Sequence, residues 1–408
     1  MKYVVVLGDG MADYPVESLG GRTPLQVAAK PHIDALAAQG YVGMVQTVPA
    51  GLAPGSDTAN LAVLGYDPRL YYTGRSPFEA ASMGVPLADD DLTFRCNFVT
   101  LSAAAVYADR VMLDHSADEI SSAEAEILLA AVSEQFSTAE LAFYPGVSYR
   151  HLLVWHGAPT EWQLTPPHDI LDRRIGDYLP GGTAAAQVLA MQEASVALLE
   201  AHPINIERQK QGLRPANAIW LWGEGTKPQL PAFSEKYGLH GAVISAVDLI
   251  KGLGRCAGLD VLEVAGATGN LETNFPGKVQ AALAALQSGT DFVYLHLEAP
   301  DECGHRQETA NKVKSIELLD QQIIQPLCAG LAAAGAPYRL LLLPDHATPL
   351  ALRTHTADPV PFLIYDSTVQ VDQGPTQYDE AAAKDGGQFV GEGYTLMDLF
   401  LAPSQGGE

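Results

Sequence analysis

Short runs of aliphatic and β-branched residues recur along this chain, and three of them are followed closely by an aspartate. The run at 4–7 leads into Asp9, the run at 292–297 into Asp301, and the run at 340–343 into Asp345. Continuous apolar runs of this length are typical of strands buried on both faces of a parallel sheet. Because the carboxyl ends of parallel strands lie at one edge of a sheet, where ligands bind, we expect the three aspartates to meet there.

Helical patterns alternate with these strands in the last third of the chain. Apolar residues recur at three- and four-residue spacing over 278–287 and 312–333, and a further strand is expected at 361–365. This alternation predicts the α/β class with a doubly wound, mostly parallel sheet.

The middle of the chain has a different pattern. Strand candidates at 94–101, 151–155 and 218–222 are mixed with amphipathic helices at 123–136 and 183–201. We therefore expect residues 85–227 to form a smaller α+β domain, inserted into an α/β domain made of residues 1–84 and 228–408. Two consecutive domains, the first ending near residue 230, are the alternative.

Composition restricts the partners of the chain. Twenty-four Lys and Arg residues against 48 Asp and Glu residues give a formal charge of −24, and 47% of the residues are apolar. The apolar content excludes disorder, and the acidity without a basic run excludes a nucleic-acid partner. An anionic substrate must therefore be held by a few sequestered cations or by metal ions.

Features of export or membrane insertion are not recognisable in the sequence. No apolar stretch approaches the roughly 20 residues of a membrane helix, and the first residues lack a signal-peptide pattern. The cysteines are far apart and form no C-x-x-C pair, which favours reduced thiols. We expect a cytoplasmic protein with no membrane partner.

Histidines accompany the strand-end aspartates. His305 follows Asp301 by four residues, His346 follows Asp345 directly, and His355 lies in a nearby polar loop. Mixed carboxylate and imidazole ligands suit zinc, manganese and other first-row metals. A single strand-end aspartate is more often a helix cap, and a single histidine more often a core or surface residue. Taken together, ligands from several separate segments predict a two-metal site.

Ser56 is the candidate nucleophile. It follows Gly55 and opens an apolar helix, where backbone amides favour an anion. A serine next to a divalent metal can lose its proton and attack phosphorus. The alternative is that Ser56 only caps the helix. Cys303 is a conceivable soft ligand, but its neighbours already supply the ligands.

The chain resembles the alkaline phosphatase superfamily and, within it, the archaeal type of cofactor-independent phosphoglycerate mutase. The segments that carry the resemblance are Gly8-Asp9-Gly10-Met11, Pro54-Gly55-Ser56-Asp57-Thr58-Ala59-Asn60, Ala299-Pro300-Asp301-Glu302-Cys303-Gly304-His305, Pro344-Asp345-His346-Ala347-Thr348-Pro349 and Thr354-His355-Thr356. The resemblance covers essentially the whole chain and implies an alkaline-phosphatase-like sheet with an inserted domain.

The resemblance also implies which residues bind metal. One ion is expected on Asp301, His305 and His355, and a second on Asp9, Ser56, Asp345 and His346. Manganese is the first choice, with zinc, cobalt or magnesium as alternatives, and no 2,3-bisphosphoglycerate is required.

Further residues are expected to handle the substrate. Arg150 and Arg214 are the candidate phosphate ligands of the inserted domain, with His151 and Asp169 near the migrating phosphoryl group. An arginine in so acidic a protein is also commonly a surface ion-pair partner. Lys236 is a candidate cation of the first domain, and Lys227 competes with it.

The implied activity is interconversion of 3-phosphoglycerate and 2-phosphoglycerate through a phosphoserine, in glycolysis and gluconeogenesis. Three alternatives remain: a metal-dependent phosphatase or phosphodiesterase of the same superfamily, a homoserine kinase-like phosphotransferase, and a non-catalytic protein that binds a phosphorylated metabolite. In each case the partner is a small phosphorylated molecule. Whether the chain forms a homo-oligomer is left open.

Overall fold

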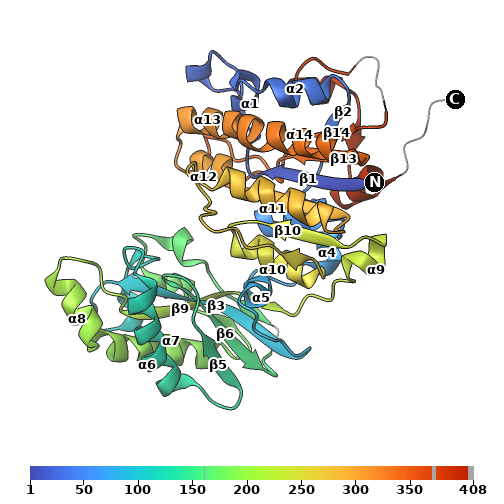
Figure 1. The fold of residues 1–408 in the computed structure, drawn as a ribbon. Coiled ribbons are helices and arrows are strands. Elements are labelled where there is room, and N and C mark those ends of the chain that lie inside the picture. The colour runs from blue at the N-terminus through green and yellow to red at the C-terminus, as the bar shows by residue number, and fades with distance from the viewer. Residues whose placement is uncertain (160, 370–373, 403–408) are drawn as a thin grey trace. The chain divides into compact units, whose positions relative to one another are not determined.

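The computed structural model describes residues 1–159, 161–369 and 374–402, which form two compact units (Figure 1). The first unit comprises Met1–Tyr72 and Gln229–Glu408, and the second comprises Thr73–Pro228. The second unit begins before the residue 85 expected for the inserted domain. The reason is that helix α5 (Ser76–Ser82) contacts strand β3 (Asp91–Leu101) and therefore belongs with the strands of the second unit.

The first unit is built on an eight-stranded sheet in the order β11-β10-β12-β1-β13-β14-β2-β15. The pairings from β11 through β13 are parallel, whereas β14 is antiparallel to both of its neighbours. This confirms the predicted mostly parallel sheet. Its strands are β1 (Lys2–Gly8), β2 (Tyr41–Val45), β10 (Gly241–Ile244), β11 (Asp260–Val261), β12 (Phe292–Leu297), β13 (Tyr338–Leu343), β14 (Val360–Asp366) and β15 (Phe389–Val390). The two edge strands, β11 and β15, have two residues each.

Helices cover both faces of this sheet, as expected for a doubly wound fold. Helices α11, α13 and α14 share one apolar cluster with alternate residues of β1, β12 and β13. On the other face, α3 contacts β12 and α16 contacts β1. The helices are α1 (Pro24–Val27), α2 (Pro31–Ala37), α3 (Ser56–Val63), α4 (Pro68–Tyr71), α9 (Phe233–Tyr237), α10 (Asp248–Cys256), α11 (Phe275–Gln287), α12 (Ala299–His305), α13 (Thr309–Leu319), α14 (Gln325–Ala334), α15 (Glu380–Asp385) and α16 (Leu396–Leu401).

The helix expected over 312–333 is interrupted. A π-helical turn at Asp320–Ile324 separates α13 from α14. Pro326 in the first turn of α14 has no amide hydrogen to donate, and the Asp320 carboxylate accepts the Ile33 amide at 2.7 Å. These two features explain why one periodic segment forms two helices.

The second unit is an antiparallel sheet in the order β4-β3-β6-β5, with β9 also paired to β3. Helices α6 and α7 cover one of its faces. The strands of this sheet are β3, β4 (Met112–Asp114), β5 (Leu141–Tyr144), β6 (Arg150–His156) and β9 (Ala218–Thr226). Strands β7 (Trp162–Gln163) and β8 (Gly181–Gly182) form a separate antiparallel pair in the second unit. Its helices are α5, α6 (Ser122–Phe136), α7 (Ala185–Glu200) and α8 (Pro203–Lys210).

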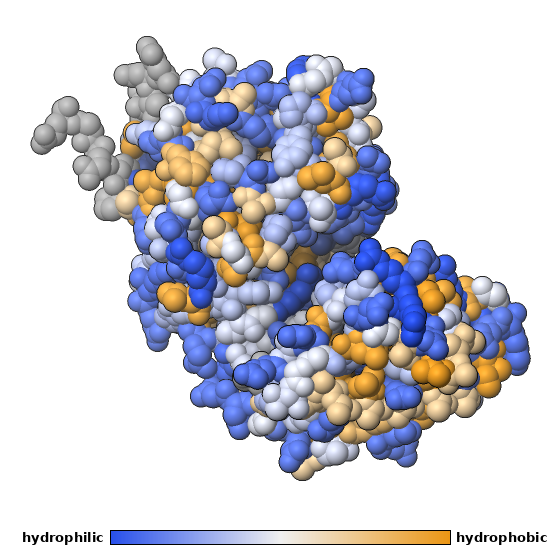
Figure 2. Space-filling model, turned by 180° about the vertical axis from the view of Figure 1, so that it is seen from behind, coloured by the Kyte–Doolittle hydropathy of each residue, from blue (hydrophilic) through white to orange (hydrophobic). Residues whose placement is uncertain are grey.

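Each unit has its own apolar core, and apolar side chains that reach the surface appear as orange areas among blue polar ones (Figure 2). Among the described residues, no helix is both long and apolar enough to cross a bilayer.

Candidate metal centre

Three segments that follow strands of the first unit bring polar side chains together at the carboxyl edge of its sheet. Asp9 follows β1, Asp301 and His305 lie one turn apart on α12 after β12, and Asp345 follows β13. A bridge from Met11 to Ala347 joins the loops after β1 and β13, and a second bridge joins Ala347 to Thr356 within the segment after β13. The second bridge holds the loop that carries His355 against the loop that carries His346. The predicted strand-end aspartates therefore meet as expected.

Gly10 lets the turn after β1 pass close to α12. Its φ of 60° lies in the left-handed region, and a Cβ on this residue would lie 2.6 Å from Asp301 Oδ1 and 2.5 Å from Thr348 Oγ1. The Gly10 amide donates to Asp345 Oδ1 at 3.2 Å. A residue without a side chain is therefore required where two of the carboxylates converge.

One group of donor atoms consists of Asp9, Asp345 and His346, all buried. His346 Nε2 lies 3.6 Å from Asp9 Oδ1 and 3.4 Å from Asp345 Oδ2. The fourth residue expected here is Ser56, whose Oγ lies 3.1 Å from His346 Nε2. The structure thus brings together all four residues expected to share one ion.

The second group is centred on Asp301. Its carboxylate lies 3.2 Å from His305 Nε2 and 3.4 Å from His355 Nε2, and the two imidazole nitrogens are 2.9 Å apart. The rings of His346 and His355 are tilted against each other with centroids 4.0 Å apart. His346 also falls within the donor group of Asp301 and His355, so the two groups are contiguous.

Ser56 is the first residue of α3, and the N-cap position belongs to Gly55. No side chain caps this helix. The interpretation of Ser56 as a capping residue is therefore wrong, and its hydroxyl is directed to His346 instead. Backbone amides at this helix end favour a negative charge near Ser56.

Charge is the dominant property of the cluster. Burial, together with the Asp345 and Asp301 carboxylates, raises the pKa of Asp9 well above its usual value. Burial also acts to raise the pKa of Asp301, but hydrogen bonds with His305 and His355 outweigh it and hold that pKa well below its usual range. The hydrogen bond to Asp301 raises the pKa of His305 to about 9. So many buried carboxylates can stay ionised together only beside positive charge, from protons or from metal cations.

The donor set fits divalent first-row metals. It combines carboxylate oxygens, imidazole nitrogens and one hydroxyl. Asp9 Oδ1 is buried and has no hydrogen-bond partner among the described residues, so it is free to bind a cation. Such an unsatisfied buried oxygen is costly unless something binds it.

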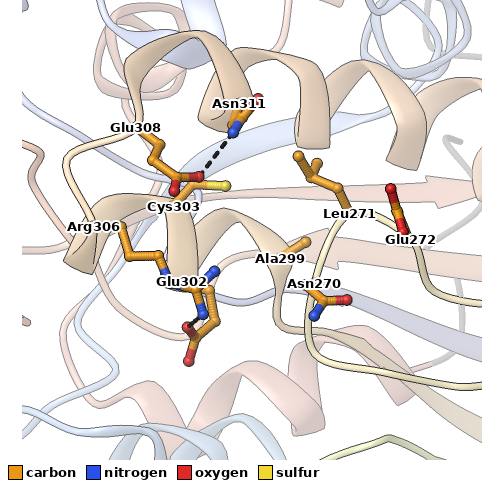
Figure 3. A pocket seen from close by; sticks show the side chains of 9 residues that line it. All are labelled: Asn270, Leu271, Glu272, Ala299, Glu302, Cys303, Arg306, Glu308 and Asn311. Atoms are coloured by element: carbon orange, nitrogen blue, oxygen red, sulfur yellow. Dashed lines mark hydrogen bonds and ion pairs between the residues drawn. The ribbon is translucent and has the colours of Figure 1, made fainter.

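Cys303 is not part of this cluster. Ala299, Glu302, Cys303 and Arg306 recur at helical spacing and face a cavity of about 230 Å³ beside the loop that carries Asn270 (Figure 3). Asp301 and His305 project from a different side of α12. Burial raises the pKa of the Cys303 thiol to about 11, which keeps it protonated. The low expectation for Cys303 as a ligand therefore agrees with its position.

The residues expected to bind substrate in the second unit differ in exposure and in ion pairing. Arg150 is exposed on β6, with its guanidinium 5.5 Å from the ring centre of Tyr149. Arg214 forms ion pairs with Asp114 at 3.1 Å and Asp118 at 3.8 Å, which matches the surface ion-pair alternative. Asp169 is exposed, 3.6 Å from His168.

His151 is a core residue of the second unit. Its side chain is buried, its Nδ1 accepts the Gly146 amide at 3.1 Å, and its ring contacts Phe98 edge-on. Burial lowers its pKa to about 4, so the ring is neutral.

Arg150 belongs to a cluster of cationic and aromatic side chains in the second unit, and the other members of this cluster were not predicted from the sequence. Phe94, Cys96 and Phe98 of β3 belong to the apolar core, so Arg95 and Asn97 lie on the other face of the strand. The Arg95 guanidinium lies 4.3 Å from the ring centre of Trp222, and the ring of His168 contacts the same tryptophan. Burial lowers the pKa of Arg95 to about 10, against the ion pair with Glu79 at 3.0 Å, and the nearby charges of Arg75 and Arg150 act in the same direction as burial.

We refer to Arg75, Arg95, Arg150, His115 and His168 as the cationic cluster. His115 is 6.2 Å from His168 between ring centres and contacts Tyr149. The signal in the sequence was Arg95 between Phe94 and Cys96 of a predicted strand, because a buried arginine requires a partner, which is Glu79 here.

Lys236 is not brought to the metal centre. Its amine contacts the Gly65 carbonyl and lies 4.9 Å from the ring centre of Tyr66. Gly65 follows the far end of α3, about 13 Å along the helix axis from Ser56 at 1.5 Å per residue. Lys227 belongs to the second unit and pairs with Asp89 at 3.0 Å.

Comparison with known proteins agrees with this arrangement. Residues 37–205 match the family model for 2,3-bisphosphoglycerate-independent phosphoglycerate mutase. A protein of Methanothrix thermoacetophila named as this mutase is 51% identical over 402 residues, covering 98% of this chain and 100% of that protein. A Geobacter sulfurreducens protein named as a probable mutase of this kind is 50% identical over 401 residues, with the same coverage.

Solved structures extend the similarity to the fold. A protein from Pyrococcus horikoshii matches with a TM-score of 0.81 at 30% identity, covering 100% of this chain and 99% of that one. A cofactor-independent phosphoglycerate mutase from Thermoplasma acidophilum matches with a TM-score of 0.65 at 28% identity, covering 98% and 99%. The chain belongs to the family of 2,3-bisphosphoglycerate-independent phosphoglycerate mutases.

Proposed function

We propose that this protein interconverts 3-phosphoglycerate and 2-phosphoglycerate through a phosphoserine at Ser56. The observation that carries the proposal is the position of the Ser56 hydroxyl, 3.1 Å from His346, where the two groups of aspartates and histidines meet. The named relatives support the choice of substrate. As a step of glycolysis and gluconeogenesis, the reaction would take place in the cytoplasm.

The proposed metal ligands are those that the cluster supplies. One ion would be held by Asp301, His305 and His355, and the other by Asp9, Ser56, Asp345 and His346. Mn²⁺ is our first choice because it accepts carboxylate and imidazole ligands alike, as zinc and cobalt do. When bound, the ions would lower the pKa of the Ser56 hydroxyl and offset the negative charge of the phosphoryl group.

Ser56 would exchange the phosphoryl group with the substrate in two balanced steps. Its oxygen attacks phosphorus, the bond to the 3-oxygen of glycerate breaks, and that oxygen takes a proton. The 2-hydroxyl of the same glycerate then loses a proton and attacks the phosphoserine, which frees Ser56. The amides at the start of α3 favour the charge of the phosphoserine.

The cationic cluster is the proposed site for the substrate anion in the second unit. Arg95 and Arg150 supply positive charge and His168 a hydrogen-bond donor in an otherwise acidic protein. Asp169, next to His168, is the candidate carboxylate for carrying the hydroxyl proton. Arg214 remains a weaker candidate because two carboxylates, Asp114 and Asp118, already pair with it, whereas Arg95 pairs with Glu79 alone among the described residues. The buried His151 would support Tyr149 and Arg150 in the adjoining chain.

Phosphorus NMR on protein reloaded with Mn²⁺, freed of excess metal and given 3-phosphoglycerate alone, tests the proposal. We expect 2-phosphoglycerate with little inorganic phosphate and without added 2,3-bisphosphoglycerate. Inorganic phosphate as the main product would indicate a phosphatase, and turnover only with homoserine and ATP a kinase.

The Ser56→Ala variant tests the covalent step. We expect no transfer with nearly unchanged metal content, whereas Ser133→Ala, on α6 in the second unit, should react like the wild type. Appreciable turnover by Ser56→Ala would overturn the phosphoserine mechanism.

A further inference from the structure

Strand β12 directs two polar side chains to the same face of the sheet. Tyr294 and His296 are two residues apart and therefore point the same way, while Val293, Leu295 and Leu297 point into the apolar cluster on the other face. Both polar side chains are almost completely buried, with exposed fractions of 0% and 1%. Buried polar groups at these positions need specific partners.

Tyr294 acts on Asp345 through Asn60. The Tyr294 hydroxyl donates to Asn60 Oδ1 at 2.5 Å. The other end of the amide faces a carboxylate oxygen and a backbone carbonyl, which only accept hydrogen bonds, so that end must be Nδ2 and the end facing Tyr294 must be the oxygen. Nδ2 donates to Asp345 Oδ2 at 2.7 Å and to the Ser56 carbonyl at 2.8 Å. One amide thus ties a metal-centre carboxylate to the residue that carries the nucleophile.

His296 acts on Asp9 directly. Its Nε2 lies 3.0 Å from Asp9 Oδ2, and its Nδ1 lies 3.2 Å from the Ser245 hydroxyl. That hydroxyl accepts the Val247 amide at 2.9 Å, which leaves its own hydrogen for Nδ1. An ionised carboxylate only accepts hydrogen bonds, so the neutral ring must carry its hydrogen on Nε2 and donate it to Asp9.

We refer to the contacts Tyr294–Asn60–Asp345 and His296–Asp9 as the two relays, and both act on a carboxylate in the same way. Each directs one hydrogen-bond donor to one oxygen of a carboxylate, which fixes the orientation of that carboxylate. His296 occupies Asp9 Oδ2, and Asp9 Oδ1 is left without a partner among the described residues. Outer contacts of this kind set the orientation and the affinity of metal ligands.

We propose that Tyr294 and His296 are positioning residues for the ion held by Asp9, Asp345 and His346. The inference rests on the metal binding in the proposed function. Strand β12 would thus orient two carboxylates that follow other strands, Asp9 after β1 and Asp345 after β13. The ion held by Asp301, His305 and His355 does not depend on these relays.

The test is a titration of metal-free protein with Mn²⁺, followed by the EPR signal of free Mn²⁺. Tyr294→Phe removes one hydroxyl, and His296→Leu removes the ring donor. We expect each to raise the dissociation constant of one ion by between about 10-fold and 100-fold and to leave the other ion unchanged. His296→Gln, whose amide nitrogen can replace Nε2, should restore most of the affinity.

Tyr378→Phe is the matched control. Tyr378 is also fully buried in the first unit, and its hydroxyl donates to the Pro361 carbonyl at 2.8 Å, in contact with no metal-centre carboxylate. Both tyrosine variants should lower the melting temperature of the metal-free protein, but only Tyr294→Phe should lose affinity for one ion.

If the Tyr294→Phe and His296→Leu variants both bind Mn²⁺ like the wild type, this inference is overturned and the proposed function is not. An equal loss of affinity for both ions in Tyr294→Phe would also overturn it, because it would indicate a general loss of packing. Wild-type protein that takes up no Mn²⁺ would overturn the proposed function as well, so the two failures are distinguishable.

Discussion

At the scale of single residues, Gly10 is the position where backbone conformation and the metal centre depend on each other. We predict that Gly10→Ala lowers the free energy of unfolding by roughly 1 to 3 kcal/mol because of its positive φ. It should also weaken Mn²⁺ binding, because the new Cβ would lie 2.6 Å from Asp301 Oδ1. Urea denaturation and a Mn²⁺ titration measure the two effects.

Gly20 supplies the control for this prediction. It has a φ of 68°, and a Cβ there would meet no atom within 4 Å. Gly20→Ala should therefore cost stability without affecting Mn²⁺ binding. Equal Mn²⁺ affinity of the Gly10 and Gly20 variants would show that Gly10 does not control the position of Asp301.

Glu380 gives a prediction about pH. Burial raises its pKa to about 7, although Thr23 and the Asp13 amide donate to it. The folded protein then holds a proton that the unfolded chain releases near its ordinary pKa of about 4.3. The contribution of Glu380 to the free energy of unfolding therefore falls as pH rises between these two values.

Glu380→Gln should abolish this dependence. Relative to the wild type, the variant should gain roughly 2 kcal/mol between pH values of about 4.5 and 7. Urea denaturation at several pH values measures the difference, and Glu17→Gln, at an exposed position, is the control. A constant difference between Glu380→Gln and the wild type over this range would contradict the prediction.

At the scale of elements, helix α13 fastens the two turns that carry metal-centre residues. The buried Lys312 amine donates to Asp13 Oδ2 at 2.8 Å, after β1, and to the Thr348 carbonyl at 2.7 Å, after β13. Thr348 in turn donates its hydroxyl to Asp301. One helix residue thus connects the loops of two strands with α12.

We predict that Lys312→Met lowers the free energy of unfolding by about 3 to 5 kcal/mol, because it leaves Asp13 buried without its partner. Lys314→Met on the same helix removes only an exposed ion pair with Glu317 and should cost less than about 1 kcal/mol. Urea denaturation of both variants measures this. A Lys312→Met variant as stable as Lys314→Met would show that the buried pair is not needed.

The elements also show how far the sequence could predict the structure. Buried strands such as β12 and β13 were recognised because their apolar runs are continuous. Strand ends and the neighbouring histidines indicated six of the seven expected metal-centre residues, and the resemblance to a known family added Ser56 as a ligand and divided the residues between two ions. The role of Asn60 was not predictable, since it depends on a contact with Asp345 across 285 positions of the chain. Of the cationic cluster only Arg150 was predicted, because its members come from segments that only the folded sheet of the second unit brings together.

At the scale of the whole molecule, the formal charge of −24 makes the folded state repel itself. Dissolved salt screens this repulsion, with a Debye length of about 10 Å at 0.1 M. We predict that the melting temperature of metal-free protein rises by roughly 2 °C or more when NaCl is raised from about 20 mM to about 200 mM. Calorimetry measures this, and a melting temperature that falls with salt would show that attractive ion pairs dominate instead.

The short edge strands of the large sheet have a consequence for the behaviour of many copies in a crowded solution. A long edge strand offers a row of unpaired amides and carbonyls on which another chain can add a strand, and this is a common route to aggregation. Strands β11 and β15 are each two residues long, so they offer very few such groups. Mutual repulsion of strongly acidic copies acts in the same direction. The eight-stranded sheet of the first unit should therefore not add strands from other copies of the protein at high concentration.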